Sequence, residues 1–304
     1  MGEGTMEKKN DGRSLLMLVL SMFIFGTIGI FRRFIPLPSS VIALARGLIG
    51  ALAIGLLMLL RRQKFARDAV RGQLGRLVLS GALLGINWIL LFESYQYTSV
   101  AVATLCYYMA PILVILVSPL ALRERLTLRK LCFVLLALIG MLLVSGVLRA
   151  EGGGDYRGVL FGLGAAAFYA CVVLLNKRIV GVPSYDKTVV QLFTAAIVLV
   201  PYVLLTENIT AMEWTPFSAL MLVTVGILHT AVTYALYFGS MDGLRAQTVA
   251  LFSYIDPIVA ILLSAFFLRE PMTALQIVGT VLVLFATIGS ELLGEERRSK
   301  QKEK

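Results

Sequence analysis

Three ionisable residues interrupt apolar segments of this 304-residue chain, and each could bind a charged ligand or exchange a proton. They are Arg46, His229 and Asp256. A guanidinium makes paired hydrogen bonds with a carboxylate, and a carboxyl group in a low-dielectric interior suits proton exchange. His229 lies 12 residues before Met241, and Asp256 lies 12 residues after Leu244. Antiparallel helices joined by the turn between them would therefore hold His229 and Asp256 at a similar depth.

Two interpretations stay open for each of these residues. His229 and Asp256 form a proton or ligand site, or the histidine is neutral and bonded to a helix carbonyl. Asp256 precedes Pro257, whose missing N–H leaves one carbonyl without its helical partner. Asp256 then carries function, or it makes a structural hydrogen bond as a protonated acid. Arg46 binds a ligand carboxylate, or it pairs with Glu93 or extends toward the membrane surface.

Further polar and aromatic residues of the apolar segments are candidates for lining a cavity around these charges. Each has packing or hydrogen bonding between helices as its alternative role. The candidates are Asn87, Tyr107, Tyr108, Tyr169, Gln191, Ser253 and Tyr254.

The elements that must position these residues are membrane-spanning helices. Hydrophobic residues make up 58% of the chain and charged residues only 15%, which argues against a soluble enzyme and a disordered chain. Continuous apolar runs of about 20 residues predict helices that cross a bilayer, and they lack the alternation of barrel strands. The predicted spans are 14–31, 39–60, 77–94, 99–121, 131–148, 158–176, 188–205, 216–238, 246–268 and 273–293.

The basic residues predict how these spans are oriented. With the N-terminus in the cytoplasm, 22 of the 28 Lys and Arg fall in inside segments and 5 in outside segments. This bias predicts that both termini are cytoplasmic. The net charge of +10 is dispersed over short loops and tails, so we do not expect nucleic-acid binding. The three cysteines lie in apolar segments without a CxxC pair, which predicts neither a disulfide nor a metal site.

The chain contains an internal repeat with an offset of 146 residues. Pro111 aligns with Pro257 and Tyr108 with Tyr254, while Arg123-Glu124 aligns with Arg269-Glu270. Each half holds five spans, an odd number, so the second half must be inverted relative to the first. We therefore predict an all-α integral membrane protein with ten transmembrane helices in two inverted repeats, 14–148 and 156–293, with tails 1–13 and 294–304. Inverted repeats are typical of secondary transporters with a midplane site.

The paired residues of the repeat suggest gate or capping roles. Glu124 and Glu270 end equivalent spans and would lie on opposite membrane faces, about a bilayer apart. That separation excludes a paired-carboxylate active site. Each glutamate could instead accept hydrogen bonds from the N-terminus of the following helix. Pro111 and Pro257 are the matching positions within the spans.

The sequence resembles the drug/metabolite transporter superfamily, in particular its ten-helix EamA-type permeases. The matching stretches include 23–35, 94–127 and 243–273, and the resemblance covers about 14–293. The family often has Trp where this chain has Phe25. Arg46 and Asp256 match positions that are often Arg and polar in the family. The resemblance implies transport of a small metabolite, often an amino acid or related compound, and often outward.

We expect a secondary active transporter in the plasma membrane that exports a small metabolite by alternating access. The expected partners are the lipid bilayer, a small-molecule substrate and a proton as candidate coupling ion; we expect a monomer and no cofactor or metal. The alternatives are a multidrug or organic-cation efflux permease, a channel-like facilitator and an intramembrane enzyme. HExxH, GxSxG and GxxxxGK[ST] motifs are absent from the sequence, which argues against enzyme chemistry and direct ATP drive.

Overall fold

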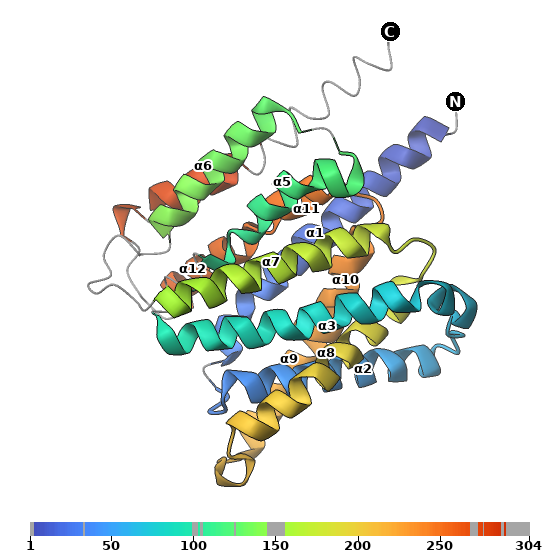
Figure 1. The fold of residues 1–304 in the computed structure, drawn as a ribbon, viewed down its shortest axis with the longest axis vertical. Coiled ribbons are helices and arrows are strands. Elements are labelled where there is room, and N and C mark those ends of the chain that lie inside the picture. Colours follow the sequence, from blue (N-terminus) through green and yellow to red (C-terminus); the bar gives the residue numbers. More distant parts are fainter. Residues whose placement is uncertain are drawn as a thin grey trace.

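The computed structural model shows an all-helical bundle (Figure 1). It describes residues 3–32, 34–98, 103, 106–124, 126–144, 156–267, 273–275, 277–286 and 289. The helices of the first half are α1 (Glu3–Arg32), α2 (Ser39–Leu60), α3 (Arg67–Tyr97), α5 (Ala110–Leu122) and α6 (Leu128–Val144). Those of the second half are α7 (Tyr156–Arg178), α8 (Ser184–Thr206), η2 (Ile209–Ala211), α9 (Pro216–Gly226), η3 (Ile227–Val232), α10 (Thr233–Ser240), α11 (Ala246–Phe252) and α12 (Ile255–Phe267).

Six described helices are long and apolar enough to cross a bilayer. They are Gly12–Phe31, Ser39–Leu60, Arg67–Tyr97, Tyr156–Arg178, Ser184–Thr206 and Pro216–Ser240. Shorter apolar helices at Ala110–Leu122, Ala246–Ala260 and Ile277–Ala286, together with α6, complete the ten spans. The predicted all-α membrane fold is thus confirmed. Helix α3 begins at Arg67 instead of residue 77, because its first turns extend beyond the apolar run as an exposed basic helix.

The helix starts follow from local sequence. Pro38 and Pro183 directly precede α2 and α8, where the first N–H groups of a helix need no partner inside it. Thr215 caps α9 by a reciprocal pair of bonds: Ser218 N donates to Thr215 Oγ1 at 3.0 Å, and Thr215 N donates to Ser218 Oγ at 3.1 Å. Pro216 occupies the first turn of the same helix, where its fixed φ suits the helix.

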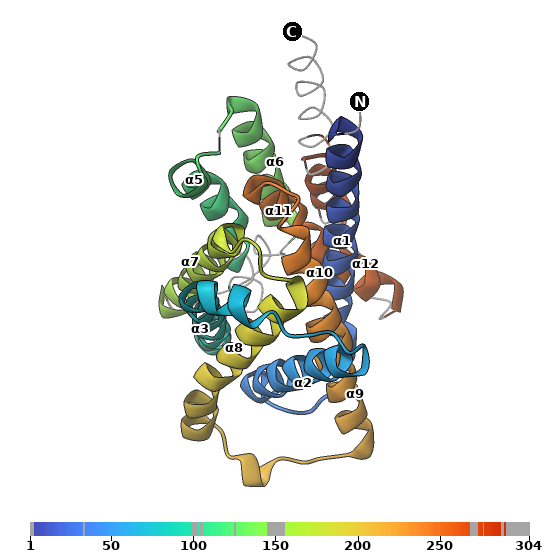
Figure 2. The same cartoon turned by 90° about the vertical axis from the view of Figure 1, so that its right-hand side faces the viewer.

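The helices of the two halves are interleaved, and the contacts are symmetric. Helix α3 packs along α7, and correspondingly α10 packs along α1; α5 contacts α7, and α12 contacts α1. Helices α2 and α8 occupy equivalent places in the two repeats and pack on each other, and α5 packs on α11 of the other repeat. Figure 2 shows α3 and α7 on one side and α1 and α12 on the other. A pseudo-two-fold relation between the halves produces this exchange of partners.

Both repeats break the helix that carries the paired proline. Residues 253–254 form a turn between α11 and α12, although 246–268 is predicted as one continuous helix. In the first repeat a turn at 108–109 precedes α5. Pro111 and Pro257 then fall in the first turn of the helix that restarts, where the missing N–H costs no hydrogen bond. Broken helices of this kind line the ligand sites of many secondary transporters.

The crossing of α1 and α12 depends on Gly26. A methyl group built there would lie 2.6 Å from the Asp256 carbonyl oxygen and 2.6 Å from Val259 Cβ. We expect Gly26→Ala to lower the free energy of unfolding by about 1–3 kcal/mol through overpacking. Gly29→Ala is the matched control, because a methyl group at Gly29 would meet no atom within 4 Å. Thermal unfolding in detergent measures both, and equal melting temperatures would contradict the close crossing.

Candidate functional site

A cavity of about 180 Å³ lies where the two halves meet. Its walls come from α1, α2, α3, α7, α10 and α12, together with Tyr107 before the break in the first repeat. The lining residues are Phe25, Ile28, Arg46, Trp88, Leu91, Phe92, Tyr107, Tyr169, Tyr234 and Asp256. Most are aromatic, and Arg46 and Asp256 are the charged ones. The cavity thus combines an aromatic wall with one cationic and one anionic group.

Arg46 is held on this wall by aromatic partners. Its guanidinium carbon lies 4.8 Å from the centroid of the Trp88 ring, a cation–π contact. The Tyr234 side chain lies close to the guanidinium on the same cavity wall. Its buried Nε has no hydrogen-bond partner, and Glu93, the partner that the sequence allowed, instead accepts from Tyr202 Oη at 2.5 Å. Arg46 therefore has no ion pair among the described residues, although its guanidinium packs on the Trp88 ring.

Asp256 lies on the same cavity in the first turn of α12. The helix restarts just before it, so the carboxyl group lies at the N-terminal end of α12. The side chain is half-buried, and none of the ion pairs within the described residues joins it to Arg46. Arg46 and Asp256 thus line the same cavity without forming an ion pair with each other.

Tyrosines extend the aromatic wall. Tyr169 Oη donates to Tyr237 Oη at 2.7 Å, and their rings are stacked with centroids 6.4 Å apart. The Tyr107 ring lies 5.7 Å from Tyr169, and Phe25 meets Tyr234 edge-on at 5.2 Å. These contacts link α1, α7 and α10 around the cavity. They give it faces that attract cationic groups and hydroxyls that donate hydrogen bonds.

The pseudo-symmetry axis passes beside the cavity. Tyr108 and Tyr254 are equivalent in the repeat, and Tyr254 Oη donates to the Tyr108 carbonyl oxygen at 3.1 Å. Two equivalent residues can contact each other only close to the axis that relates them. The candidates Tyr108 and Tyr254 therefore join the two breaks, whereas Tyr107 and Tyr169 line the cavity.

His229 makes no hydrogen bond with Asp256. Its Nε2 lies 2.8 Å from Thr27 Oγ1, and its ring meets Phe31 edge-on at 4.7 Å. Thr27 already donates its hydroxyl to Ile24 O at 2.7 Å, so its oxygen accepts from Nε2–H of His229. Nδ1 is buried without a partner. Of the two interpretations, the His–Asp pair is not formed in this structure: His229 lies in the wide helical turn η3, Ile227–Val232, and contacts α1.

Three other candidates serve contacts between or within helices. Asn87 Nδ2 donates to Ala165 O at 2.7 Å and ties α3 to α7. Gln191 Nε2 donates to Asn176 Oδ1 at 2.9 Å between α8 and α7. Ser253 Oγ donates to Val249 O at 2.9 Å. The cavity residues that the sequence did not single out, Trp88 and Tyr234 above all, hold Arg46.

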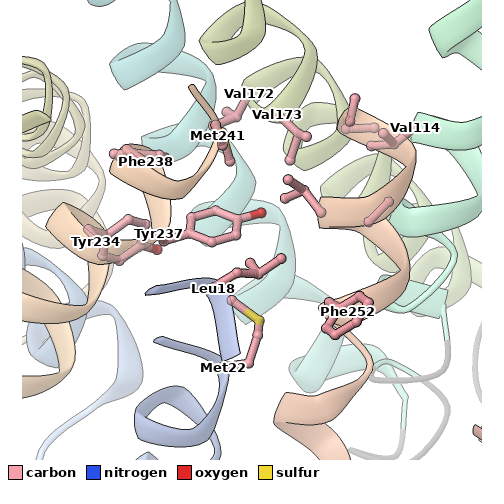
Figure 3. Packing of buried hydrophobic residues seen from close by; sticks show 14 of the residues in the cluster. Leu18, Met22, Val114, Val172, Val173, Tyr234, Tyr237, Phe238, Met241 and Phe252 are labelled. Atoms are coloured by element: carbon pink, nitrogen blue, oxygen red, sulfur yellow. The ribbon is translucent and has the colours of Figure 1, made fainter. Parts of the chain in front are cut away.

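Next to the cavity, apolar side chains from both halves close the bundle on the side of the 241–245 turn. Figure 3 shows Leu18 and Met22 of α1 converging with Tyr237 of α10 and Phe252 of α11. All four are buried. Tyr237 belongs to this closure, and its bond to Tyr169 joins the closure to the cavity wall. A solute in the cavity could leave on this side only if these helices moved apart.

Glu124 joins α5 to α11 on the side of the 241–245 turn. Its carboxylate accepts from Ala246 N at 2.8 Å and from Gln247 N at 3.4 Å, so it caps α11. The capping role was expected on the following helix, but the carboxylate reaches the other repeat because α5 packs against α11. Gln247 Nε2 also donates to Ser118 Oγ at 2.8 Å, and Lys130 Nζ donates to Gln247 Oε1 at 2.7 Å. Glu270 lies outside the described residues.

The EamA-like transporter family matches residues 12–146 and again residues 156–291. The chain belongs to this family. It is therefore a multi-pass membrane transporter of small metabolites and not an enzyme. An uncharacterized transporter YxxF of Bacillus subtilis is 29% identical over 92% of this chain and 89% of its own length.

Two further comparisons bear on family and fold. The threonine/homoserine exporter RhtA of Salmonella typhimurium is 26% identical over 79% of each chain. A solved crystal structure with 17% identity superposes with a TM-score of 0.83 over 93% of this EamA-like chain and 98% of its own. That likeness concerns the fold alone.

Proposed function

We propose that this EamA-like protein exports a small zwitterionic metabolite, an amino acid or a close relative, by alternating access. The observation that carries the proposal is the cavity that holds Arg46 and Asp256 without an ion pair between them. A zwitterion brings one partner for each charge, so its binding satisfies both groups at once. The name of the similar exporter RhtA supports an amino-acid substrate.

In the proposed complex, the substrate carboxylate binds the Arg46 guanidinium. A guanidinium forms two parallel hydrogen bonds with a carboxylate, and Trp88 and Tyr234 already orient it. The substrate ammonium group binds the Asp256 carboxylate and lies against tyrosine faces. The remaining cavity is lined by Phe25, Phe92 and other apolar groups that accept the side chain of the substrate.

We propose a proton as the coupling ion, with Asp256 as its carrier. Protonated Asp256 is neutral and gives the ammonium group no anionic partner. When the acid releases its proton to one side of the membrane, the resulting carboxylate binds the ammonium group. Rebinding of a proton from the other side then releases the substrate. Each cycle thus exchanges one proton for one zwitterion at a single carboxyl group.

An organic-cation permease remains the second candidate, because the aromatic wall and Asp256 also suit a cation. Arg46 distinguishes the two, since its positive charge on the same cavity disfavours a substrate without an anionic group. We also propose that the protein works as a monomer in the plasma membrane with both termini in the cytoplasm. The closure around Glu124 is then the cytoplasmic gate.

The gate gives a prediction for Glu124→Ala. The change removes the cap of α11, and lost caps cost about 0.5–2 kcal/mol, which shifts the equilibrium toward a cytoplasmically open state by about 2- to 30-fold. The measurement is maleimide labelling from the cytoplasmic side of Val249→Cys, a buried position, in a background without native cysteines. Glu213→Ala, at an exposed loop position, is the control. Unchanged labelling in Glu124→Ala would contradict the gate.

Counterflow in proteoliposomes tests the proposed function. Purified protein is reconstituted with an internal excess of one unlabelled amino acid, and uptake of the labelled compound is followed for a panel of amino acids. The proposal predicts uptake of at least one zwitterion above protein-free vesicles and its dependence on a pH gradient. Transport of organic cations without any zwitterion would overturn the proposal in favour of the second candidate.

A further inference from the structure

A second cavity lies on the outside of the bundle, apart from the central one. It measures about 1170 Å³ and is lined by α2, α8, η3, the start of α3 and the loop 61–66. None of its lining residues belongs to the central cavity. This cavity is the α2 groove.

The wall of the α2 groove is apolar and faces outward. Leu52 and Leu56 on α2 are 70% and 57% exposed, and Phe193 on α8 and Ile227 on η3 are 52% and 44% exposed. Side chains of this kind within membrane-spanning helices are in contact with acyl chains. The groove is therefore a recess in the lipid-facing surface, large enough to admit an acyl chain from the surrounding leaflet.

One end of the groove is basic. Lys64 and Arg67 line it, and both are exposed. The described structure gives neither side chain an ion pair or hydrogen bond. The nearby charged groups are Arg61, Arg62, Asp68 and Arg71, all exposed, and the buried Asp186, which accepts from Ala66 N at 3.3 Å. Positive charge thus prevails where the apolar recess reaches the membrane surface.

We propose that the α2 groove binds an anionic phospholipid of the cytoplasmic leaflet. An acyl chain lies along Leu52, Leu56 and Phe193, and the phosphate of the headgroup binds Lys64 and Arg67. The charge of the basic end selects anionic over zwitterionic headgroups, and basic pockets at the cytoplasmic ends of transmembrane helices bind such lipids. The cytoplasmic position of the loop 61–66 follows the topology proposed above.

The site is tested by native mass spectrometry of delipidated protein. The protein is offered phosphatidylglycerol and phosphatidylcholine with the same acyl chains in equal amounts, without any transport substrate. We expect enrichment of phosphatidylglycerol by about fivefold or more for each basic residue that contacts the headgroup. Lys64→Gln/Arg67→Gln should abolish this preference. Arg13→Gln/Arg245→Gln is the matched control, since it removes the same charge at two exposed positions outside the groove.

A second variant tests the apolar wall. Gly55 lines the groove, and a methyl group added there would meet no atom within 4 Å. We expect Gly55→Trp to fold, to fill the recess and to lower retention of both lipids. Added inorganic phosphate should not displace the lipid, because it lacks an acyl chain. Equal retention of the two lipids by the unmodified protein, or an unchanged preference in Lys64→Gln/Arg67→Gln, would overturn the proposal, whichever solute the protein transports.

Discussion

For the Arg46→Gln protein, kcat/KM for the zwitterionic substrate is expected to fall by at least about 30-fold. The change removes the one cationic group of the central cavity and leaves a substrate carboxylate without a charged partner. Truncating one member of a buried charge pair costs about 2–5 kcal/mol, which corresponds to about 30- to 4,000-fold. Arg46→Lys should recover part of the activity, since an ammonium group keeps the charge but not the paired hydrogen bonds.

Initial rates in proteoliposomes measure the effect, with Arg61→Gln as control. Arg61 is exposed at the end of α2 and lies outside the central cavity. Circular dichroism and thermal unfolding establish that the variants fold. If Arg46→Gln transported the zwitterion at the rate of the unmodified protein, the carboxylate of the substrate would bind elsewhere.

The Asp256→Asn protein is the second variant for which we expect a large effect. The amide has nearly the same size as the carboxyl group, but it can neither hold a proton reversibly nor attract an ammonium group by charge. We expect the rate of pH-driven transport to fall by about 30-fold or more, because the substrate cation loses its buried partner. The pH dependence of the remaining transport should become flat, since the exchanging group is gone.

Transport under imposed pH gradients of both directions provides the measurement. Glu213→Gln serves as the control, because Glu213 is exposed on the loop before α9. Retention of pH-gradient drive in Asp256→Asn would contradict a proton role for this residue. Loss of drive with intact substrate-gradient exchange would assign the residue to coupling and not to substrate binding.

The repeat could be predicted from the sequence because it rests on one-dimensional spacing. Pro111 and Pro257 recur with the same neighbours, and an odd number of spans in each half requires inversion. The helix breaks beside these prolines could not be predicted, because a proline within a membrane span is compatible with a kink as well as with a break. The symmetric turns became visible only with the backbone.

The charged residues of the cavity could also be predicted, because a charge inside a span is costly and needs a reason. Arg46 and Asp256 are such residues, and both line the cavity. Trp88 and Tyr234 gave no comparable signal, since aromatic residues are common in apolar spans. Their importance comes from the cation that they hold.

The depth of His229 along its helix did not determine which residue it contacts. Counting residues from the turn sets the height of a side chain along its helix but not the direction in which it points. The wide turn at Ile227–Val232 sets that direction, and His229 forms a hydrogen bond with Thr27. Glu124 shows the same limit, since the capping role follows from its chemistry but the choice of α11 follows from tertiary packing.

The central claim is that the cavity binds a solute through two opposite charges, Arg46 and Asp256. The most direct measurement compares thermal stabilisation of the purified protein by threonine, by its methyl ester and by its N-acetyl derivative. The same comparison is then made for the best substrate of the counterflow panel. A ligand at 100 times its Kd stabilises the folded state by about 2.7 kcal/mol. We predict that the zwitterion raises the melting temperature and that derivatives lacking either charge do not. Stabilisation by the methyl ester equal to that by the free zwitterion would contradict the claim.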